Sequence, residues 1–598
     1  MATKETPSPE LSAGFQANLT RIEALTKRLG EVLAARPAPS PDLPGPGVDF
    51  YAKTFSAYWA EMLSNPTKIW EQQAEYWGRT LAHAVSAQQA MLGGDDGLVP
   101  ADNTPEDRRF AHPLWHSHPY FNYLKQQYFI NADAMRKMVK TLPGLEPKER
   151  QRLAWFTGQI IDLMAPGNFL VGNPEAMIRA MESEGKSLVD GLENLIRDLE
   201  RNQGELMVTL SDPEAFTLGE NLATTEGAVV YRNQLFELIQ YAPRTEKVHK
   251  TPLIIFPPWI NKFYILDLKP ENSLIRWITE QGYTLFVVSW VNPDARHADL
   301  GLDAYIEDGF LQAMAQVKGI TGEEKLNVVG YCIGGTTLAL TLALMRQRGD
   351  DSVNAATFFT AMTDLSDQGE LEVFMGDDFI GGIEAEVAKT GIMPSLFMAR
   401  TFSFLRANDL IYRPAIRSYL MGEAPPAFDL LHWNGDGTNL PGRMAVEYLR
   451  NLCQKNSFAR GGLSLFGKNL KISDVDVPLC AVACESDHIA PWTSSYRGIR
   501  QMGSKDKSFI LSESGHVAGV VNPPSKKKYG HYLNADWPEE PEDWQAGAAF
   551  QQGSWWPSWE AWLAPRSGPM VAAREPGGPE NPVLEPAPGS YVRQPARG

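Results

Sequence analysis

The sequence predicts an α/β protein whose functional site lies at the carboxyl edge of a mostly parallel sheet. Short buried-type strands alternate with helices from residue 252 onward, a pattern typical of parallel sheets covered on both faces. Residues 326–345 have the pattern of a strand, a glycine-rich turn and an apolar helix in direct succession. At 598 residues the chain is also too long for one ordinary core, so we expect further domains.

Composition and charge exclude several classes of protein. Hydrophobic residues make up 43% of the chain, as in globular proteins, and the formal net charge is -17. This acidity argues against nucleic-acid binding and against electrostatic docking on an anionic membrane. No apolar run approaches the roughly 20 residues that span a bilayer, and residues 1–8 lack the apolar segment of a secretion signal. Four cysteines are too few for a disulfide framework, so we expect free thiols in a reducing cytoplasm.

The first 205 residues predict a linker followed by a helical domain. Residues 1–49 include a Pro/Gly-rich run, so we predict disorder or a linker there, with a short helical pattern at residues 15–32. Apolar and aromatic residues then recur at helical spacing and predict a helical N-terminal domain over residues 50–205. Its histidines at 116 and 118 have no carboxylate or cysteine cluster beside them in the sequence, so we expect no metal site.

Residues 206–568 predict the catalytic domain. Residues 228–231 and 236–241 have the pattern of an antiparallel strand pair. A series of buried-type strands follows, at residues 252–256, 284–290, 326–330, 355–359, 479–483 and 509–511. Sheets of this kind place active sites beyond the carboxyl ends of their strands.

Two further segments complete the predicted organisation. Residues 363–474 interrupt the alternation of strands and helices, and this insertion is too long for an unstructured loop, so we expect it to form a cap over the site. Residues 569–598 are rich in Pro and Gly, and we expect a disordered tail apart from Tyr591 and Val592.

Cys332 lies at the turn between the predicted strand and the predicted helix. Gly330 and Gly334 leave room for the backbone to fold tightly, and Gly335 lets the helix approach the sheet. This is the nucleophile-elbow pattern, with Cys where hydrolases usually carry Ser. We therefore predict a catalytic role for Cys332. The remaining cysteines are interpreted as buried apolar residues: Cys453, Cys480 and Cys484.

A catalytic thiol needs a base, and the base needs an orienting carboxylate. Asp487 and His516 each follow a predicted strand. The chain order Cys332, Asp487, His516 is the nucleophile–acid–base order of the α/β-hydrolase fold, which we predict for this domain. Glu485 is a competing carboxylate. His488 directly follows the acid and is interpreted as a supporting residue.

Two backbone N–H groups are expected to stabilise the oxyanion that forms during acyl transfer. Ile333, at the start of the predicted helix, supplies the first. The second is expected from the loop after the strand at residues 252–256. That loop begins with two prolines, which have no N–H, so Trp259 or Ile260 must supply it.

A cysteine nucleophile suits a thioester substrate such as an acyl-CoA. Exchange between two thioesters is nearly isoenergetic, so the acyl-cysteine stays activated toward an alcohol or water. If the acceptor is a hydroxyl group on another substrate, the net reaction makes an oxygen ester. That outcome requires the exclusion of water, which an apolar cap could provide.

A series of motifs follows in order along the chain, at residues 257–268 (PPWINKFYILDL), 289–293 (SWVNP), 330–335 (GYCIGG), 405–410 (LRANDL), 433–434 (WN), 487–492 (DHIAPW), 514–516 (SGH) and 553–557 (GSWWP). In these motifs the chain resembles the poly(3-hydroxyalkanoate) synthases, the bacterial polymerases that make polyhydroxybutyrate. The resemblance covers most of residues 50–568. The large N-terminal domain and the residues Tyr331, Ile333 and Val291 resemble class I, which favours short-chain 3-hydroxyacyl-CoA, chiefly 3-hydroxybutyryl-CoA.

The resemblance implies roles for the candidate residues. Cys332 would carry the growing acyl chain, and His516 would activate its thiol. Asp487 would help to activate the 3-hydroxyl group of the monomer by way of His516. No cofactor is implied, because CoA is a part of the substrate and the leaving group. The active form would be a cytoplasmic homodimer on the surface of polyester granules, where granule-associated proteins are possible partners.

Three residues are candidates for binding the substrate. Arg406, in the predicted cap, is our candidate for a contact with the CoA phosphates; its alternative role is an ordinary salt bridge. Trp433 and His488 lie in the matched motifs and complete the set.

Two other functions are compared with the polymerase. A thioesterase or depolymerase would use the same Cys332, Asp487 and His516 with water as the acceptor. Cysteine in place of serine counts against a depolymerase, and the long insertion and N-terminal domain count against a minimal thioesterase. A non-catalytic granule scaffold would have no need of all three residues.

Overall fold

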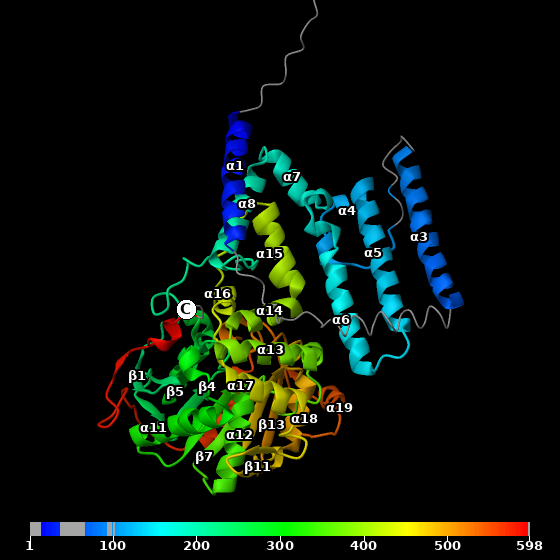
Figure 1. Cartoon of the computed structure of the whole chain (residues 1–598). Helices are drawn as coiled ribbons and strands as arrows, with labels where there is room; N and C mark the ends of the chain where they lie inside the picture. Colours follow the sequence, from blue (N-terminus) through cyan, green and yellow to red (C-terminus); the bar gives the residue numbers. More distant parts are fainter. Residues whose placement is uncertain (1–12, 36–65, 93–98, 100–101, 596–598) are drawn as a thin grey trace, which may run out of the picture. The chain divides into compact units, whose positions relative to one another are not determined.

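The computed structural model describes residues 13–35, 66–92, 99 and 102–595 (Figure 1). The chain divides into two compact units. Of the described residues, the first unit contains those up to residue 212 together with residues 402–426, and the second contains residues 213–401 and 427–595. Among the described residues, no helix combines the length and the apolar character needed to cross a bilayer.

The first unit is helical, which confirms the predicted helical N-terminal region. Proline at the first helical position begins several of its helices, where the missing N–H costs nothing. Aromatic residues at helical spacing, including Trp115, Phe121 and Tyr128, form its buried core. The main helices of the unit before residue 212 are α1 (Ala13–Ala34), α3 (Pro66–Leu92), α4 (Leu114–Ser117), α5 (Pro119–Thr141), α6 (Pro147–Leu163), α7 (Pro174–Glu182) and α8 (Lys186–Arg201).

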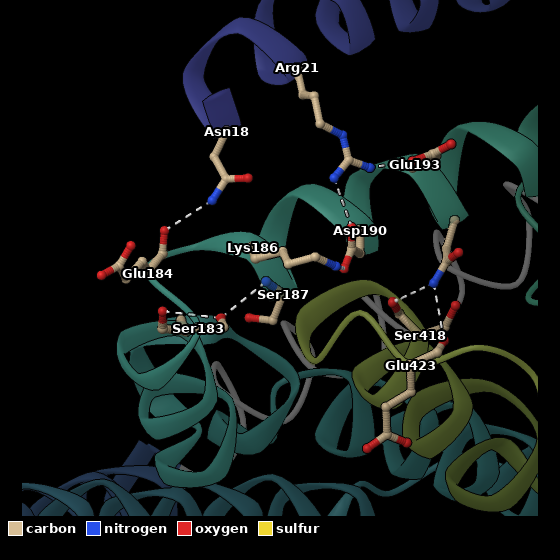
Figure 2. A network of polar contacts seen from close by, with 12 residues as sticks. Asn18, Arg21, Ser183, Glu184, Lys186, Ser187, Asp190, Glu193, Ser418 and Glu423 are labelled. Carbon is tan, nitrogen blue, oxygen red and sulfur yellow. Dashed lines mark hydrogen bonds and ion pairs between the residues drawn. The ribbon is translucent and has the colours of Figure 1, made fainter. Parts of the chain in front are cut away.

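Helix α1 packs along α8 and covers the short helical pattern seen at residues 15–32. Only the assignment of this stretch to a disordered or linker segment is wrong. Arg21 on α1 donates to Asp190 at 3.1 Å and to Glu193 at 2.6 Å, both on α8 (Figure 2). Beside these ion pairs Leu25 is buried in an apolar cluster with Val189 and Ile196 of α8. The short apolar stripe of α1 finds its partner about 170 residues away, which local composition does not reveal. The Pro/Gly-rich run at residues 37–47 lies outside the described residues.

Residues 402–426 also belong to the first unit. They were predicted as part of the cap of the catalytic domain, and that part of the prediction is wrong. Their helical turns are η9 (Asn408–Tyr412), α15 (Arg413–Ala415) and η10 (Ile416–Leu420). A Cβ atom on Gly191 of α8 would lie 2.0 Å from the carbonyl oxygen of Tyr419, so the two backbones meet at a glycine. The Tyr419 hydroxyl donates to Asp198 at 2.7 Å, and Asn194 donates to the carbonyl of Ser418 at 3.2 Å.

The second unit is built on a mixed sheet, and this confirms the predicted α/β class. Among the described residues the sheet has eleven strands in the order β15-β14-β13-β12-β7-β6-β4-β5-β2-β1-β17. The strands from β13 to β5 run parallel, and those toward the two edges pair antiparallel. The strands are β1 (Gly227–Arg232), β2 (Phe236–Tyr241), β4 (Leu253–Phe256), β5 (Leu285–Trp290), β6 (Leu326–Tyr331), β7 (Val353–Phe359), β12 (Leu479–Cys484), β13 (Lys507–Ser512), β14 (His531–Leu533), β15 (Ala549–Gln551) and β17 (Glu585–Pro586).

Helices cover this sheet and its central strands are buried. Every residue of β4, β5, β6 and β12 is buried, as the continuous apolar runs predict. Tyr331 at the end of β6 pairs with Phe359 at the end of β7, and Phe359 pairs with Val482 of β12. The carboxyl ends of these strands therefore lie side by side. The larger helices are α9 (Leu274–Glu280), α11 (Gln312–Thr321), α12 (Ile333–Arg348), α18 (Trp492–Gln501) and α20 (Trp556–Leu563).

The remainder of the insertion is structured and lies in the second unit. It includes α13 (Asp377–Thr390), most of α14 (Ser395–Leu405), α16 (Asp429–Gly435), α17 (Gly442–Glu447) and η11 (Tyr448–Gln454). A two-stranded hairpin of β10 (Leu463–Leu465) and β11 (Lys468–Leu470) precedes the return to the sheet.

The described residues of the tail, 569–595, have a defined structure. The prediction of disorder is wrong for them, apart from Tyr591 and Val592, which it did not include. β16 (Met570–Ala572) pairs with β3 (Lys247–His249), and β17 adds an edge strand to β1. Glu237 of β2 is fully buried and accepts hydrogen bonds from the backbone of Ser590 at 3.1 Å and of Tyr591 at 3.0 Å. A buried carboxylate requires such partners, and here the tail supplies them together with Arg232 of β1, whose Nε donates to Glu237 at 2.8 Å.

Candidate active site

Cys332 occupies a strained turn between β6 and α12, as the elbow pattern predicts. Its φ of 55° and ψ of -126° lie in a region that non-glycine residues rarely adopt. The Cys332 N–H donates to the carbonyl of Phe359 on β7 at 2.8 Å, and its carbonyl accepts from Gly335 at 2.9 Å. These bonds hold the turn against the end of the sheet and leave the cysteine partly exposed.

The glycines of the elbow are required by close backbone contacts. A Cβ atom on Gly330 would lie 2.5 Å from the Cα of Gly335, and one on Gly335 would lie 2.5 Å from the Cβ of Ala361. A Cβ atom on Gly334 would lie 2.7 Å from the carbonyl oxygen of Pro257. The first turn of α12 therefore packs directly on the loop that follows β4.

His516 and Asp487 form a buried hydrogen-bonded pair. His516 Nδ1 lies 2.6 Å from Asp487 Oδ2, and the exposed fractions of the two side chains are 7% and 0%. The other carboxylate oxygen, Oδ1, accepts from the backbone N–H groups of Ile489 and Ala490, each at 2.8 Å. These bonds fix the carboxylate, which in turn orients the imidazole ring.

The side chain of Cys332 lies close enough to the ring of His516 to influence its pKa. Because Nδ1 faces Asp487, Nε2 is the atom left for the thiol. Burial lowers the pKa of His516, but Asp487 and Cys332 outweigh this effect and raise the pKa well above its ordinary value. Tyr331 stacks near the ring, with centroids 5.9 Å apart. The structure thus brings together the three residues that we selected as catalytic candidates.

The competing candidates lie elsewhere. Glu485 is exposed and accepts from Gln545 at 2.7 Å, whereas the partner of His516 is Asp487. The other cysteines are buried, and burial raises the pKa of each thiol, to about 12 for Cys453. A raised thiol pKa disfavours the nucleophilic thiolate.

The two backbone groups selected for the oxyanion hole lie on adjoining segments. Ile333 is the first residue of α12, so its N–H has no acceptor within its own helix. Ile260 lies on the loop after β4, whose Pro257 carbonyl approaches Gly334. The alternative residue, Trp259, turns its indole into the protein and donates to Thr337 of α12 at 3.1 Å. The donor roles of Ile333 and Ile260 remain predictions.

The three substrate-binding candidates have different surroundings. Trp433 on α16 is buried, and its indole N–H donates to the carbonyl of Lys262 at 2.8 Å. His488 is half-buried beside Asp487. Arg406 lies in the first unit, whereas the catalytic candidates lie in the second. The roles of all three in binding substrate remain predictions.

Sequence reasoning missed two residues, one in the insertion and one in the loop that follows β4. Tyr448, from η11 of the insertion, packs its ring against that of Trp259 with centroids 5.5 Å apart. Burial raises its pKa well above the ordinary value, and the nearby Cys453 and Cys332 add to this effect. Lys262 was not selected either, although it lies within one of the matched motifs. A lysine inside an apolar motif was the available signal, since lysine is rarely buried unless paired.

This arrangement can carry out acyl transfer through a cysteine. His516 can accept the thiol proton, and Asp487 stabilises the resulting imidazolium. The N–H groups of the first turn of α12 are positioned close to the thiol, where an oxyanion would form. Among the described residues, no group of three or more His, Cys, Asp or Glu side chains is arranged to hold a metal ion.

Comparisons with known families agree with this chemistry. Residues 106–278 match the family model described as the poly-beta-hydroxybutyrate polymerase (PhaC) N-terminus. Residues 251–523 match the model of the alpha/beta hydrolase fold, which confirms the predicted fold of the second unit.

Curated relatives match over most of the chain. The poly(3-hydroxyalkanoate) polymerase subunit PhaC of Rhizobium meliloti is 40% identical, over 89% of this chain and 89% of the relative. The corresponding subunit of Cupriavidus necator is 41% identical, over 84% of this chain and 85% of the relative. The poly(3-hydroxyalkanoate) polymerase of Methylorubrum extorquens is 40% identical, over 92% and 91%. This chain belongs to the poly(3-hydroxyalkanoate) polymerase family.

The polymerase is therefore an acyltransferase built on an α/β-hydrolase domain. Membership of this family favours polymer synthesis over the thioesterase and the scaffold, the two alternatives that the sequence left open. The family assignment leaves the monomer and the route of the acyl group to be argued from the site.

Proposed function

We propose that the polymerase joins short-chain (R)-3-hydroxyacyl groups, chiefly 3-hydroxybutyryl groups from 3-hydroxybutyryl-CoA, through acyl chains carried on Cys332. The observation that carries this proposal is the buried hydrogen bond between His516 and Asp487, beside the strained Cys332 turn at the carboxyl edge of the sheet. It combines a nucleophile, a base and an orienting carboxylate within one buried site.

The first step transfers the acyl group from CoA to the enzyme. His516 takes the thiol proton, and the Cys332 thiolate attacks the thioester carbonyl. The oxyanion is stabilised by backbone N–H groups, for which Ile333 and Ile260 are our candidates. Collapse of the intermediate breaks the bond to the CoA sulfur, and the imidazolium of His516 returns a proton to the departing thiolate. Its raised pKa supports the imidazolium that this step requires.

The second step forms the oxygen ester. His516, now neutral and oriented by Asp487, accepts a proton from the 3-hydroxyl group of an incoming monomer. The alkoxide attacks the acyl-Cys332 thioester, an ester bond forms, and Cys332 leaves as a thiolate that recovers its proton. Transfer of the lengthened chain back to Cys332 releases one CoA for each unit added. The route needs no cofactor.

Monomer class and setting are part of the same proposal. Tyr331, Ile333 and Val291 resemble the class I enzymes, which favour short-chain monomers. We propose that the polymerase acts as a homodimer on the surface of cytoplasmic polyester granules, where it can meet granule-associated proteins.

The test is to supply the purified protein with 3-hydroxybutyryl-CoA and to measure both free CoA and the mass of the acyl product. We expect CoA release with polyester of high mass. Cys332→Ala should abolish both, and the same measurement with longer 3-hydroxyacyl-CoA should give slower release.

Other outcomes would contradict the proposal. Release of CoA with only free 3-hydroxybutyrate would indicate a thioesterase. Polymer formation by the Cys332→Ala variant would show that the acyl chain is carried elsewhere.

A further inference from the structure

A buried lysine lies at the end of the loop that carries the candidate oxyanion donor. Lys262 follows Ile260 by two residues, and its exposed fraction is 7%. Its ammonium group lies 2.6 Å from Asp436 Oδ1 and donates to the carbonyl oxygen of Gln594 at 2.9 Å. One acceptor therefore comes from the insertion and the other from the C-terminal tail.

The surroundings of Asp436 connect this lysine to the loop backbone. Asp436 Oδ2 accepts from the hydroxyl group of Tyr264 at 3.0 Å. The carbonyl of Lys262 accepts from the indole of Trp433 at 2.8 Å, and Asn261 forms an isolated antiparallel bridge with Gly437. Residues on both sides of Asp436 thus hold the backbone of residues 261–262.

The tail residue that binds Lys262 is itself held in place. Four residues before Gln594, the backbone N–H of Ser590 donates to the buried Glu237 at 3.1 Å. One residue after it, the carbonyl of Pro595 accepts from Asn292 at 2.5 Å. The tail is therefore attached on both sides of the carbonyl that Lys262 contacts.

A buried ammonium group is stable only where its donors are satisfied. Lys262 has two identified acceptors, and the carbonyl of Gln594 is the only one of them supplied by the tail. Without that carbonyl, the ammonium group must recruit water or move, and the loop would move with it. An oxyanion donor must keep its position to within about 0.5 Å to be effective.

We propose that Lys262 is a positioning residue that holds the Pro257–Lys262 loop, and with it the N–H of Ile260, in place for acyl transfer, and that the C-terminal tail completes this support through Gln594. The inference rests on the proposed function, because it concerns the oxyanion of the same acyl transfer. It assigns a role in catalysis to the tail.

Truncation after Arg593 tests the contribution of the tail. This variant loses the carbonyls of Gln594 and Pro595 but keeps the Glu237 anchor. The matched control is truncation after Pro595, which keeps both carbonyls. We expect kcat for CoA release to fall about 10- to 100-fold in the shorter variant with KM little changed, because small displacements of catalytic groups have effects of this size. The control should match the full chain.

Alkylation of Cys332 by iodoacetamide separates positioning from general damage. This reaction needs the thiolate and His516 but forms no oxyanion. The shorter variant should therefore be alkylated at the rate of the full chain although its acyl transfer is slow. Equal loss of both rates would contradict the proposal, because it would show a disturbed Cys332–His516 pair. Unchanged kcat in the shorter variant would also contradict it.

Substitutions at Lys262 provide an independent measurement. The double variant Lys262→Met/Asp436→Asn avoids leaving an unpaired buried carboxylate and should show the same selective loss of kcat. Lys262→Arg keeps the positive charge and should retain part of the kcat that the double variant loses. If the full chain itself releases no CoA, the proposed function fails. If the full chain is active and all these variants are equally active, only the present inference fails.

Discussion

In the first turn of α12, Gly334 lies directly against Pro257 of the loop that follows β4. A Cβ atom on Gly334 would lie 2.7 Å from the carbonyl oxygen of Pro257. This contact brings the segments of the two candidate oxyanion donors together. It depends on the absence of a single side-chain carbon.

Gly334→Ala should therefore damage the site. We expect a loss of about 1 to 3 kcal/mol in the free energy of unfolding, as for other overpacked positions, and a fall in kcat of about 10-fold or more because the loop must move. Denaturant unfolding and CoA release measure the two effects. Gly381→Ala on α13 is the control: a Cβ atom there meets nothing within 4 Å, so activity should be unchanged. Equal stability and equal CoA release in the two variants would contradict this prediction.

Asp487→Asn should lower turnover by about 100-fold or more, because the base loses its orienting carboxylate. The pKa of His516 should fall, since Asp487 helps to raise it. Less imidazolium then means less thiolate, and alkylation of Cys332 at pH 7 should slow. Glu485→Gln is the control, because Glu485 contacts Gln545 and not His516. A larger loss of turnover in Glu485→Gln than in Asp487→Asn would show that Glu485 is the orienting carboxylate.

The raised pKa of His516 also predicts a pH dependence of stability. Ionised His516 stabilises the fold fully below its ordinary pKa of about 6.5, and this contribution is lost as the pH rises through the higher pKa of the folded state. The advantage of the wild type over His516→Gln in free energy of unfolding should thus shrink with rising pH.

His531 provides the opposite case for comparison. Burial lowers its pKa despite a hydrogen bond with the carbonyl of Gly553. The free energy of unfolding of the wild type should therefore rise relative to that of His531→Gln as the pH rises through about 6.5. Denaturant unfolding at several pH values measures both slopes. Slopes of the same sign would contradict the assigned pKa directions.

Glu237→Gln should loosen the tail from the sheet. Glu237 is fully buried and accepts from Ser590 and Tyr591, whereas the amide group of glutamine would face N–H donors. We expect a loss of about 2 kcal/mol in the free energy of unfolding. Glu580→Gln, at an exposed position of the same tail, should change it by less than about 0.5 kcal/mol. Faster cleavage of the tail by trypsin is a second readout for Glu237→Gln.

The contact between α1 and α8 should depend on apolar burial more than on its ion pairs. Leu25 is 8% exposed, so Leu25→Ala should cost about 2 kcal/mol. Arg21 has a 42% exposed side chain, and Arg21→Ala should cost less than about 1 kcal/mol, because exposed pairs contribute little. Hydrogen exchange of the α1 backbone, measured in each variant, should show the larger increase for Leu25→Ala.

Much of the catalytic unit could be predicted because its signals are local. The buried strands alternate with helices in single stretches of chain, and the glycines around Cys332 indicate a tight turn whatever the rest of the fold. The order of Cys332, Asp487 and His516 then follows from the fold, since successive parallel strands present their carboxyl ends at one edge. The choice of Asp487 over Glu485 agrees with the hydrogen bond observed.

Other features depended on contacts between distant parts of the chain. Composition marks residues 569–595 as disordered, but a proline-rich segment becomes ordered when a buried partner such as Glu237 needs its N–H groups. Residues 402–426 join α8 because Gly191 admits the backbone of Tyr419. Lys262 meets Gln594 across 332 positions of sequence. Local propensity shapes strands, helices and turns, whereas the satisfaction of buried polar groups is decided only once the whole chain has folded.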